Sequence, residues 1–329
     1  MTEEEEMRST GSLSGGLTSI TSRRARDNRS LSQSNIPEVW LWCTFSLALM
    51  YILLLPVSSW AHGFAGKRFF PTTFQVEDPF VSDEFSVLVG HIKEPEGKTT
   101  EVEIEYSKRI LPELGISLGE TYSHQDPFEG ESVSGFGNLE VGLKYQFPAS
   151  EEHEAILSLG TSLEIGGTGA KRVEASSHST ISPALYFGKG FGDLPESMNV
   201  LRPFAVTGVI SPNIPFEDEP NTLTWAFSLQ YSLIYLQSFV KDVGLGNPFK
   251  RMVFVAEFPM ETCLDHACQG QTTGYFNPGI VWCGKYIELG VAAQIPINKQ
   301  TGSTVGILGL VHVYVDDLFP KSIGRPIFP

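Results

Sequence analysis

Residues 222–235 form a stretch in which large apolar and small polar side chains alternate. The apolar positions are Leu223, Trp225, Phe227, Leu229, Tyr231, Leu233 and Tyr235, and those between them are Thr222, Thr224, Ala226, Ser228, Gln230, Ser232 and the exceptional Ile234. A period of two places alternate side chains on opposite faces of an extended strand. At about 3.3 Å per residue the apolar series is roughly 40 Å long, and most strands in soluble proteins are about half that length. Tilted by ~45°, such a strand rises about 28 Å, close to the ~25 Å apolar band of a membrane barrel.

Turn residues divide the rest of the chain after residue 83 into further segments of suitable length to cross a membrane. These segments are residues 84–93, 101–106, 115–122, 138–147, 154–165, 179–190, 201–209, 251–258, 274–283, 285–295 and 304–315. With the stretch at 222–235 they predict an all-β, closed antiparallel membrane β-barrel of about twelve strands. An even count suits a barrel whose two termini lie on the periplasmic side. A soluble β-sandwich with its apolar face inward is the alternative architecture.

In a barrel, the polar face of each strand lines the lumen. The candidate lumen-lining residues are Glu103, Glu105, Glu140, Lys144, Glu154, Glu164, Gln230 and Glu257. His312 shares a face with Leu310 and Tyr314, so we expect it to line the interior and not to act as a catalyst. In a sandwich, the charged residues would instead form the solvated outer face.

An uncharged run at residues 40–57 follows four arginines and precedes Ser59-Trp60-Ala61. This arrangement predicts a Sec-type signal peptide cleaved after Ala61 or after Ala65, and an uncleaved inner-membrane anchor is the alternative. We therefore expect export to the outer membrane of a Gram-negative bacterium. The expected organisation is a disordered polar lead (1–36), a signal peptide or anchor (37–61), a periplasmic segment (62–82), the barrel (83–318) and a C-terminal tail (319–329).

A net charge of −15 argues against nucleic acid as a partner. Cys263 and Cys268 are disulfide candidates in an exported chain, and a metal site on these two cysteines with His266 is the alternative. His62 would begin the mature chain after cleavage at Ala61, which makes it a candidate copper ligand. No catalytic constellation is visible, so we expect neither an enzyme nor a cofactor.

The two ends of the barrel region carry distinctive sequences. Gly66-Lys67-Arg68-Phe69-Phe70-Pro71 and Asp78-Pro79-Phe80-Val81-Ser82-Asp83-Glu84 precede the first strand, and Tyr314-Val315-Asp316-Asp317-Leu318-Phe319-Pro320 ends the last. These stretches resemble those of uncharacterised proteobacterial outer-membrane β-barrel proteins. More loosely, the architecture is similar to the transporter-type barrels of phenol-degradation pathways. The resemblance covers mainly the two ends and identifies no functional residue.

The function expected from these features is a passive outer-membrane channel or transporter for small neutral, hydrophobic or cationic solutes. Its partners would be outer-membrane lipid and a small solute. A periplasmic or membrane-tethered β-sandwich binding module is the alternative function.

Overall fold

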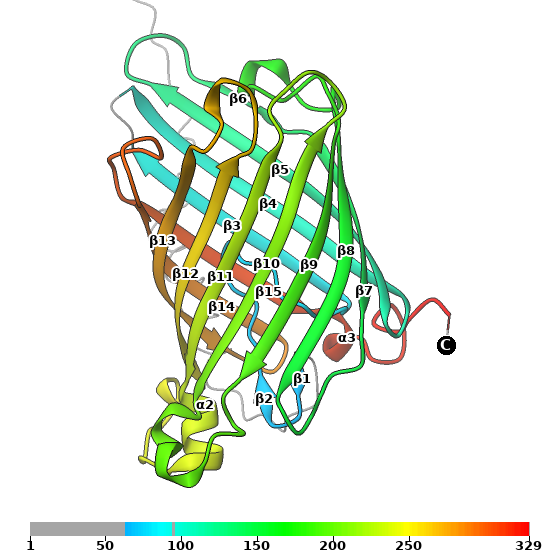
Figure 1. Cartoon of the computed structure of the whole chain (residues 1–329), viewed down its shortest axis with the longest axis vertical. Coiled ribbons are helices and arrows are strands. Elements are labelled where there is room, and N and C mark those ends of the chain that lie inside the picture. The colour runs from blue at the N-terminus through cyan, green and yellow to red at the C-terminus, as the bar shows by residue number, and fades with distance from the viewer. Residues whose placement is uncertain (1–62, 94–95, 329) are drawn as a thin grey trace, which may run out of the picture. The chain divides into compact units, whose positions relative to one another are not determined.

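The computed structural model describes residues 63–93 and 96–328, and twelve long strands dominate it (Figure 1). Their bounds are β3 (Glu84–Lys93), β4 (Gly97–Leu111), β5 (Leu114–Pro127), β7 (Leu139–Gln146), β8 (Ala155–Ile165), β9 (Thr180–Gly190), β10 (Phe204–Pro215), β11 (Thr222–Ser232), β12 (Met252–Cys263), β13 (Thr272–Cys283), β14 (Ile287–Pro296) and β15 (Gly306–Tyr314). Shorter elements are β1 (Phe64–Ala65), β2 (Arg68–Phe69), β6 (Val133–Phe136), α2 (Leu233–Tyr235), α3 (Val315–Leu318) and the single turns η1 (Lys171–Val173), η2 (Glu196–Leu201), η3 (Leu236–Val240), η4 (Phe249–Arg251) and η5 (His266–Cys268).

Each long strand pairs antiparallel with the next long strand in sequence, and the sheet closes on itself. The closing pair joins β15 to β3, with Tyr314 opposite Glu84 and Leu310 opposite Leu88. Closure removes both edges of the barrel sheet, so each of the twelve long strands has a partner on each side. The predicted closed antiparallel barrel of twelve strands is confirmed, and the β-sandwich alternative is wrong.

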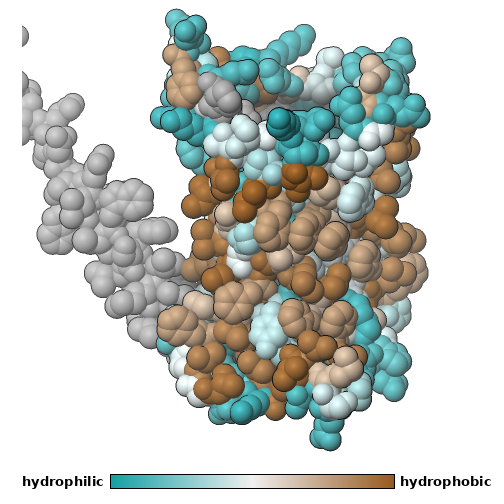
Figure 2. Space-filling model, turned by 60° about the vertical axis from the view of Figure 1, so that its left-hand side comes forward, coloured by the Kyte–Doolittle hydropathy of each residue, from teal (hydrophilic) through white to brown (hydrophobic). Residues whose placement is uncertain are grey.

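On the face shown in Figure 2, apolar side chains form a broad band across the barrel, and hydrophilic residues gather toward its two ends. β11 shows how the alternation divides between the faces. Ser228 and Gln230 are buried inside the barrel, whereas Leu229 between them is 37% exposed on the outer surface. The apolar face of this strand therefore contributes to the lipid-facing surface, and its polar face contributes to the interior wall.

Several strand ends differ from the sequence-based expectation: β4, β5 and β12 are longer than expected, and the ends of β11 and β10 have clear local causes. β11 ends at Ser232, so the expected extension to Tyr235 is wrong. The strand ends there because the Ser232 hydroxyl accepts a hydrogen bond of 3.1 Å from the Tyr235 amide and caps the start of helix α2. β10 continues to Pro215, beyond the expected end at Val209, because Pro212 and Asn213 still pair with Leu223 and Thr222.

We call the end of the barrel at Glu84 and Tyr314 the proximal end, and the opposite end the distal end. Helices α2 and α3 lie at the proximal end, and β6 lies at the distal end (Figure 1). Within residues 63–93 and 96–328, no helix is long and apolar enough to cross a bilayer. The lead at 1–36, the signal peptide at 37–61 and His62 lie outside the described residues.

A charge placed on the lipid-facing surface should destabilise the barrel. Val291 lies on the outer face of β14 and is 53% exposed, and Arg or Lys near a bilayer midplane costs ~2–4 kcal/mol. We expect V291R to lower the free energy of unfolding in lipid vesicles by about that amount, measured by denaturant titration. V305R is the matched control, because Val305 is similarly exposed but lies in the connection between β14 and β15. Equal losses in the two variants would contradict the lipid-facing assignment.

Candidate functional site: a plugged lumen with an acidic cavity

The chain between β2 and β3 runs inside the barrel (Figure 1). We call residues 70–83 the plug. The side chains of Phe74 and Val76 pack against inward-facing residues of β12 and β9, respectively, and both are buried. A segment without regular structure must satisfy its backbone polar groups through side chains of the surrounding wall.

Glu257 of β12 provides the main attachment for the plug. Its buried carboxylate accepts hydrogen bonds from three successive backbone amides: Phe74 at 2.8 Å, Gln75 at 3.1 Å and Val76 at 3.3 Å. Hydrogen bonds to charged groups are stronger than neutral ones, and removing the acceptor would leave three donors without partners. Glu257 therefore holds the tip of the plug in the middle of the lumen.

Three further wall residues add to this attachment. The Gln75 side-chain oxygen accepts hydrogen bonds from the amides of Asn277 at 2.8 Å and Gln294 at 3.1 Å. Nearer the proximal end, the backbone amide of Thr72 donates to Glu288 Oε2 at 3.0 Å. Side chains of β12, β13 and β14 thus bind the plug together.

Glycines in the wall make room for the Phe74 ring. A Cβ added at Gly290 would lie 2.9 Å from Phe74 Cε1, and one added at Gly279 would lie 2.7 Å from Phe74 Cε2. Both distances are too short for carbon atoms to approach without displacement. The barrel wall is therefore recessed at the place where the plug inserts its aromatic side chain.

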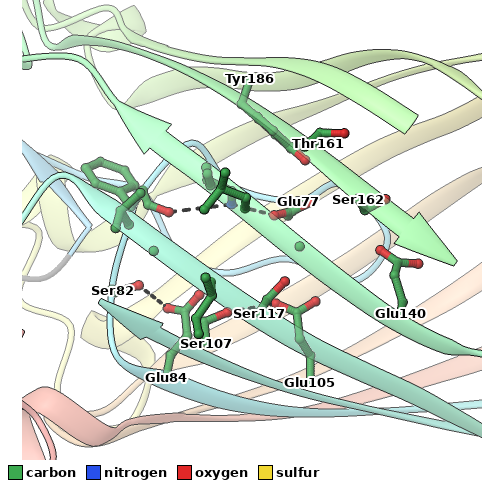
Figure 3. A pocket seen from close by; sticks show the side chains of 17 residues that line it. Glu77, Ser82, Glu84, Glu105, Ser107, Ser117, Glu140, Thr161, Ser162 and Tyr186 are labelled. Atoms are coloured by element: carbon green, nitrogen blue, oxygen red, sulfur yellow. Dashed lines mark hydrogen bonds and ion pairs between the residues drawn. The ribbon is translucent and has the colours of Figure 1, made fainter. Parts of the chain in front are cut away.

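Lys144 of β7 binds the returning half of the plug. Its ammonium group forms an ion pair with Glu77 and donates to the carbonyl of Asp78 at 2.9 Å. It also lies 4.6 Å from the centre of the Tyr186 ring. The Lys144 ammonium group is thus paired with polar groups of the plug. Glu105 and Glu140 point into the same pocket (Figure 3).

A cavity of about 640 Å³, which we call the distal cavity, lies along the plug and reaches from Glu84 to Glu261 near the distal end of β12. Its lining contains eight carboxylates and no lysine or arginine: Glu77, Asp78, Glu84, Glu103, Glu105, Glu140, Glu164 and Glu261. Apolar side chains near the plug, including Leu88, Val209 and Leu310, complete it. Such a lining attracts cations, disfavours anions and leaves an apolar surface at its inner end.

A second cluster lies at the proximal end. The buried guanidinium of Arg68 pairs with Glu154 at 3.3 Å and lies 3.8 Å from the centre of the Tyr235 ring. The Tyr235 hydroxyl donates to Glu154 Oε1 at 2.8 Å. Burial, together with this hydrogen bond, raises the pKa of Tyr235 to about 12, so the hydroxyl remains a donor at neutral pH. The cluster joins the β1–β2 hairpin to two connections of the barrel.

At the distal end, Cys263 and Cys268 are joined by a disulfide. Between them, His266 Nδ1 lies 2.6 Å from Asp265 Oδ1 and its Nε2 lies 3.2 Å from Asp218 Oδ1. Residue 218 belongs to the β10–β11 connection, so this contact joins two distal loops. No described group of three or more His, Cys, Asp or Glu residues is arranged to hold a metal ion.

The structure brings together most of the residues selected from sequence. Glu103, Glu105, Glu140 and Glu164 line the distal cavity, and the buried Gln230 donates to Thr207 at 3.3 Å. Glu257 and Lys144 bind the plug, and Glu154 lies apart in the proximal cluster. His312 is buried and contributes to the cavity wall.

Sequence inspection missed the plug and its partners Asn277 and Glu288. Residues 72–78 have no periodic pattern that distinguishes a lumenal segment from a solvated one. Asn277 and Glu288 do lie on the inward face of their strands, as the alternation with Ile280 and Leu289 indicates. The alternation could therefore have identified them as interior residues, but not as contacts of the plug.

No family model and no curated protein matches this sequence. Solved structures that resemble the chain include outer-membrane channels. The KdgM porin has 15% identity and a TM-score of 0.41 over 69% of this chain and 98% of that one. The NanC porin has 8% identity and a TM-score of 0.44 over 70% and 98%. The COG4313 outer membrane channel from Pseudomonas putida F1 has 10% identity and a TM-score of 0.44 over 74% and 99%. Likenesses of this size identify no solute.

Removing the Glu257 carboxylate should loosen the plug. We expect E257A to accelerate hydrogen exchange at the amides of residues 74–76 by roughly 5- to 150-fold, because unsatisfied buried donors cost about 1–3 kcal/mol. Exchange followed by mass spectrometry measures this. E261A is the matched control, since Glu261 lies on the same strand and lines the cavity but has no described hydrogen bond to the plug. Unchanged exchange in E257A would contradict the role of Glu257.

The distal loop contact should depend on pH. Hydrogen bonds to Asp265 and then Asp218 raise the pKa of His266, so the stabilisation is fully present below the ordinary value near 6.5. It is lost as the pH rises through the raised value. We expect an NMR titration of His266 to show this upward shift, and D265N to reduce it more than D218N. A His266 titration unaffected by either substitution would contradict the contact.

Proposed function

We propose that the protein is an outer-membrane channel for small neutral, hydrophobic or cationic solutes, closed by the plug in the described state. The observation that carries this proposal is the distal cavity, whose lining has eight carboxylates and no lysine or arginine. Carboxylate rings favour cations in membrane pores. Apolar side chains at the inner end of the cavity support the inclusion of hydrophobic solutes, which the resemblance to transporters of phenol-degradation pathways also predicts.

The proposed orientation places the proximal end in the periplasm and the distal end outside the cell. An even number of strands places both barrel termini at the proximal end, as is usual for bacterial barrels of this type. The Cys263–Cys268 disulfide at the distal end suits an exported surface. A solute would then enter the acidic cavity first and meet the plug second.

Opening would require displacement of the plug, because it crosses the lumen between strands far apart around the barrel, with contacts to Glu257 of β12 and Lys144 of β7. The attachment is polar and localised on a few wall residues, chiefly Glu257 and Lys144. It can therefore be weakened without altering the lipid-facing surface.

Planar bilayer recording tests the proposal. We expect the unaltered protein to conduct rarely and E257A to conduct more often, by roughly 5- to 150-fold in open probability for a loss of about 1–3 kcal/mol; G290A should also conduct more often. G290A displaces the Phe74 ring, and G309A is its matched control, since a Cβ at Gly309 would meet no atom within 4 Å. No conductance in any variant would overturn the channel and leave a binding role for the cavity.

The same recordings test the charge preference. In a salt gradient, we expect a reversal potential of the sign that denotes cation preference, reduced in E103Q/E140Q. E113Q is the control, because Glu113 lies in the proximal β4–β5 turn, away from the cavity lining. Anion preference in the E257A background would contradict the electrostatic argument.

A further inference from the structure

The longest proximal connection joins β11 to β12. We call residues 233–251 the proximal arm; it comprises α2, η3 and η4 and extends beyond the proximal end of the barrel (Figure 1). Periplasmic turns of outer-membrane barrels are usually short. A connection of this length, with its own folded structure, therefore needs an explanation beyond joining two strands.

The arm exposes large apolar side chains although its base is firmly held. Phe239, Val243 and Phe249 are 48%, 46% and 57% exposed. At the base, Tyr235 is buried against Arg68 and bonded to Glu154. Farther along, the Leu245 amide donates to Gln237 Oε1 at 2.9 Å. The exposed side chains thus belong to an ordered surface.

The arm connects two strands, β11 and β12, that contribute to the lipid-facing band. Phe254, three residues after the arm, is 44% exposed on the outer face of β12, and Leu229, four residues before it, is exposed on β11. Figure 2 shows apolar residues continuing below the band almost to the lower end of the face shown. The arm therefore begins and ends next to outward-facing apolar residues of the lipid-facing band.

The charge of the arm is opposite to that of the chain. It contains Lys241, Lys250 and Arg251 against the single acid Asp242, in a chain with a net charge of −15. Lys67 of the β1–β2 hairpin adds a cation 5.6 Å from the centre of the Phe239 ring. Aromatic residues flanked by cations are typical of segments that lie at the boundary between acyl chains and headgroups.

We propose that the proximal arm is an interfacial membrane anchor. Phe239, Val243 and Phe249 insert at the acyl boundary of the leaflet at the proximal end, and Lys241 and Lys250 face anionic phospholipid headgroups. Lipid is favoured over a protein partner because the arm joins two strands of the band and carries an excess of cations, which anionic headgroups attract. The proposal rests on the barrel spanning a membrane, and it is independent of whether the lumen conducts.

Site-directed spin labelling of the full chain in vesicles tests the anchor. Nitroxides are placed by F239C or F249C in a C43S/C283S background, and their accessibility to oxygen and to a water-soluble nickel chelate is compared. V291C in the band is the lipid reference, and F216C in the β10–β11 connection is the aqueous reference. We expect both arm labels to have an oxygen-to-nickel ratio several-fold above that of F216C.

Vesicles of phosphatidylcholine with and without phosphatidylglycerol test the headgroup contact. Phosphatidylglycerol should raise the ratio further at F239C, and K241Q/K250Q should abolish that increase. Arm labels that match F216C would overturn the anchor, and an increase that survives K241Q/K250Q would overturn the headgroup contact. An oxygen-to-nickel ratio at V291C as low as that at F216C would instead contradict the membrane barrel itself.

Discussion

The interaction on which the interior depends is the set of three hydrogen bonds from the plug backbone to Glu257. A lumen filled by an irregular segment has no sheet to satisfy that segment's amides, so the wall must supply acceptors at the correct height. Glu257 accepts hydrogen bonds at the tip of the plug, and Glu288 accepts one nearer the proximal end. The Gln75 side chain accepts hydrogen bonds from Asn277 and Gln294. Inward-facing polar residues therefore have two roles: some line a cavity, and others replace the hydrogen bonds that the plug would make with water.

The outer surface follows a simpler rule. One side chain in two faces lipid, and the alternation along β11 or β7 is sufficient to identify which one. This is why the twelve strands and their closure could be predicted from residues such as Leu229 and Ser228 without knowledge of the pairing. Strand ends were less predictable, because they depend on local hydrogen bonds. The Ser232 hydroxyl ends β11, and continued pairing of Pro212 extends β10.

The candidate site was only partly predictable for a related reason. Alternation identifies Glu103, Glu140 and Glu257 as inward-facing but says nothing about what each one meets. Glu103 faces the cavity, whereas Glu257 is covered by a segment about 180 residues earlier in the chain. Glu154, which follows the same polar pattern in sequence, lies at the proximal end because β8 begins only at Ala155, and its partner is Arg68. Contacts between such distant segments leave no periodic signal in either one.

The ion pair between Lys144 and Glu77 has a consequence for the electrostatics of an open lumen. Two of the eight carboxylates around the cavity, Glu77 and Asp78, belong to the plug. If the plug withdraws, it removes both negative charges and releases the Lys144 ammonium into the lumen. The negative electrostatic potential that a solute meets when it enters the cavity is then stronger than the potential in the open lumen through which it passes. Capture and passage would be governed by different charge distributions, and the same movement that clears the path also weakens retention of a cation on its way through.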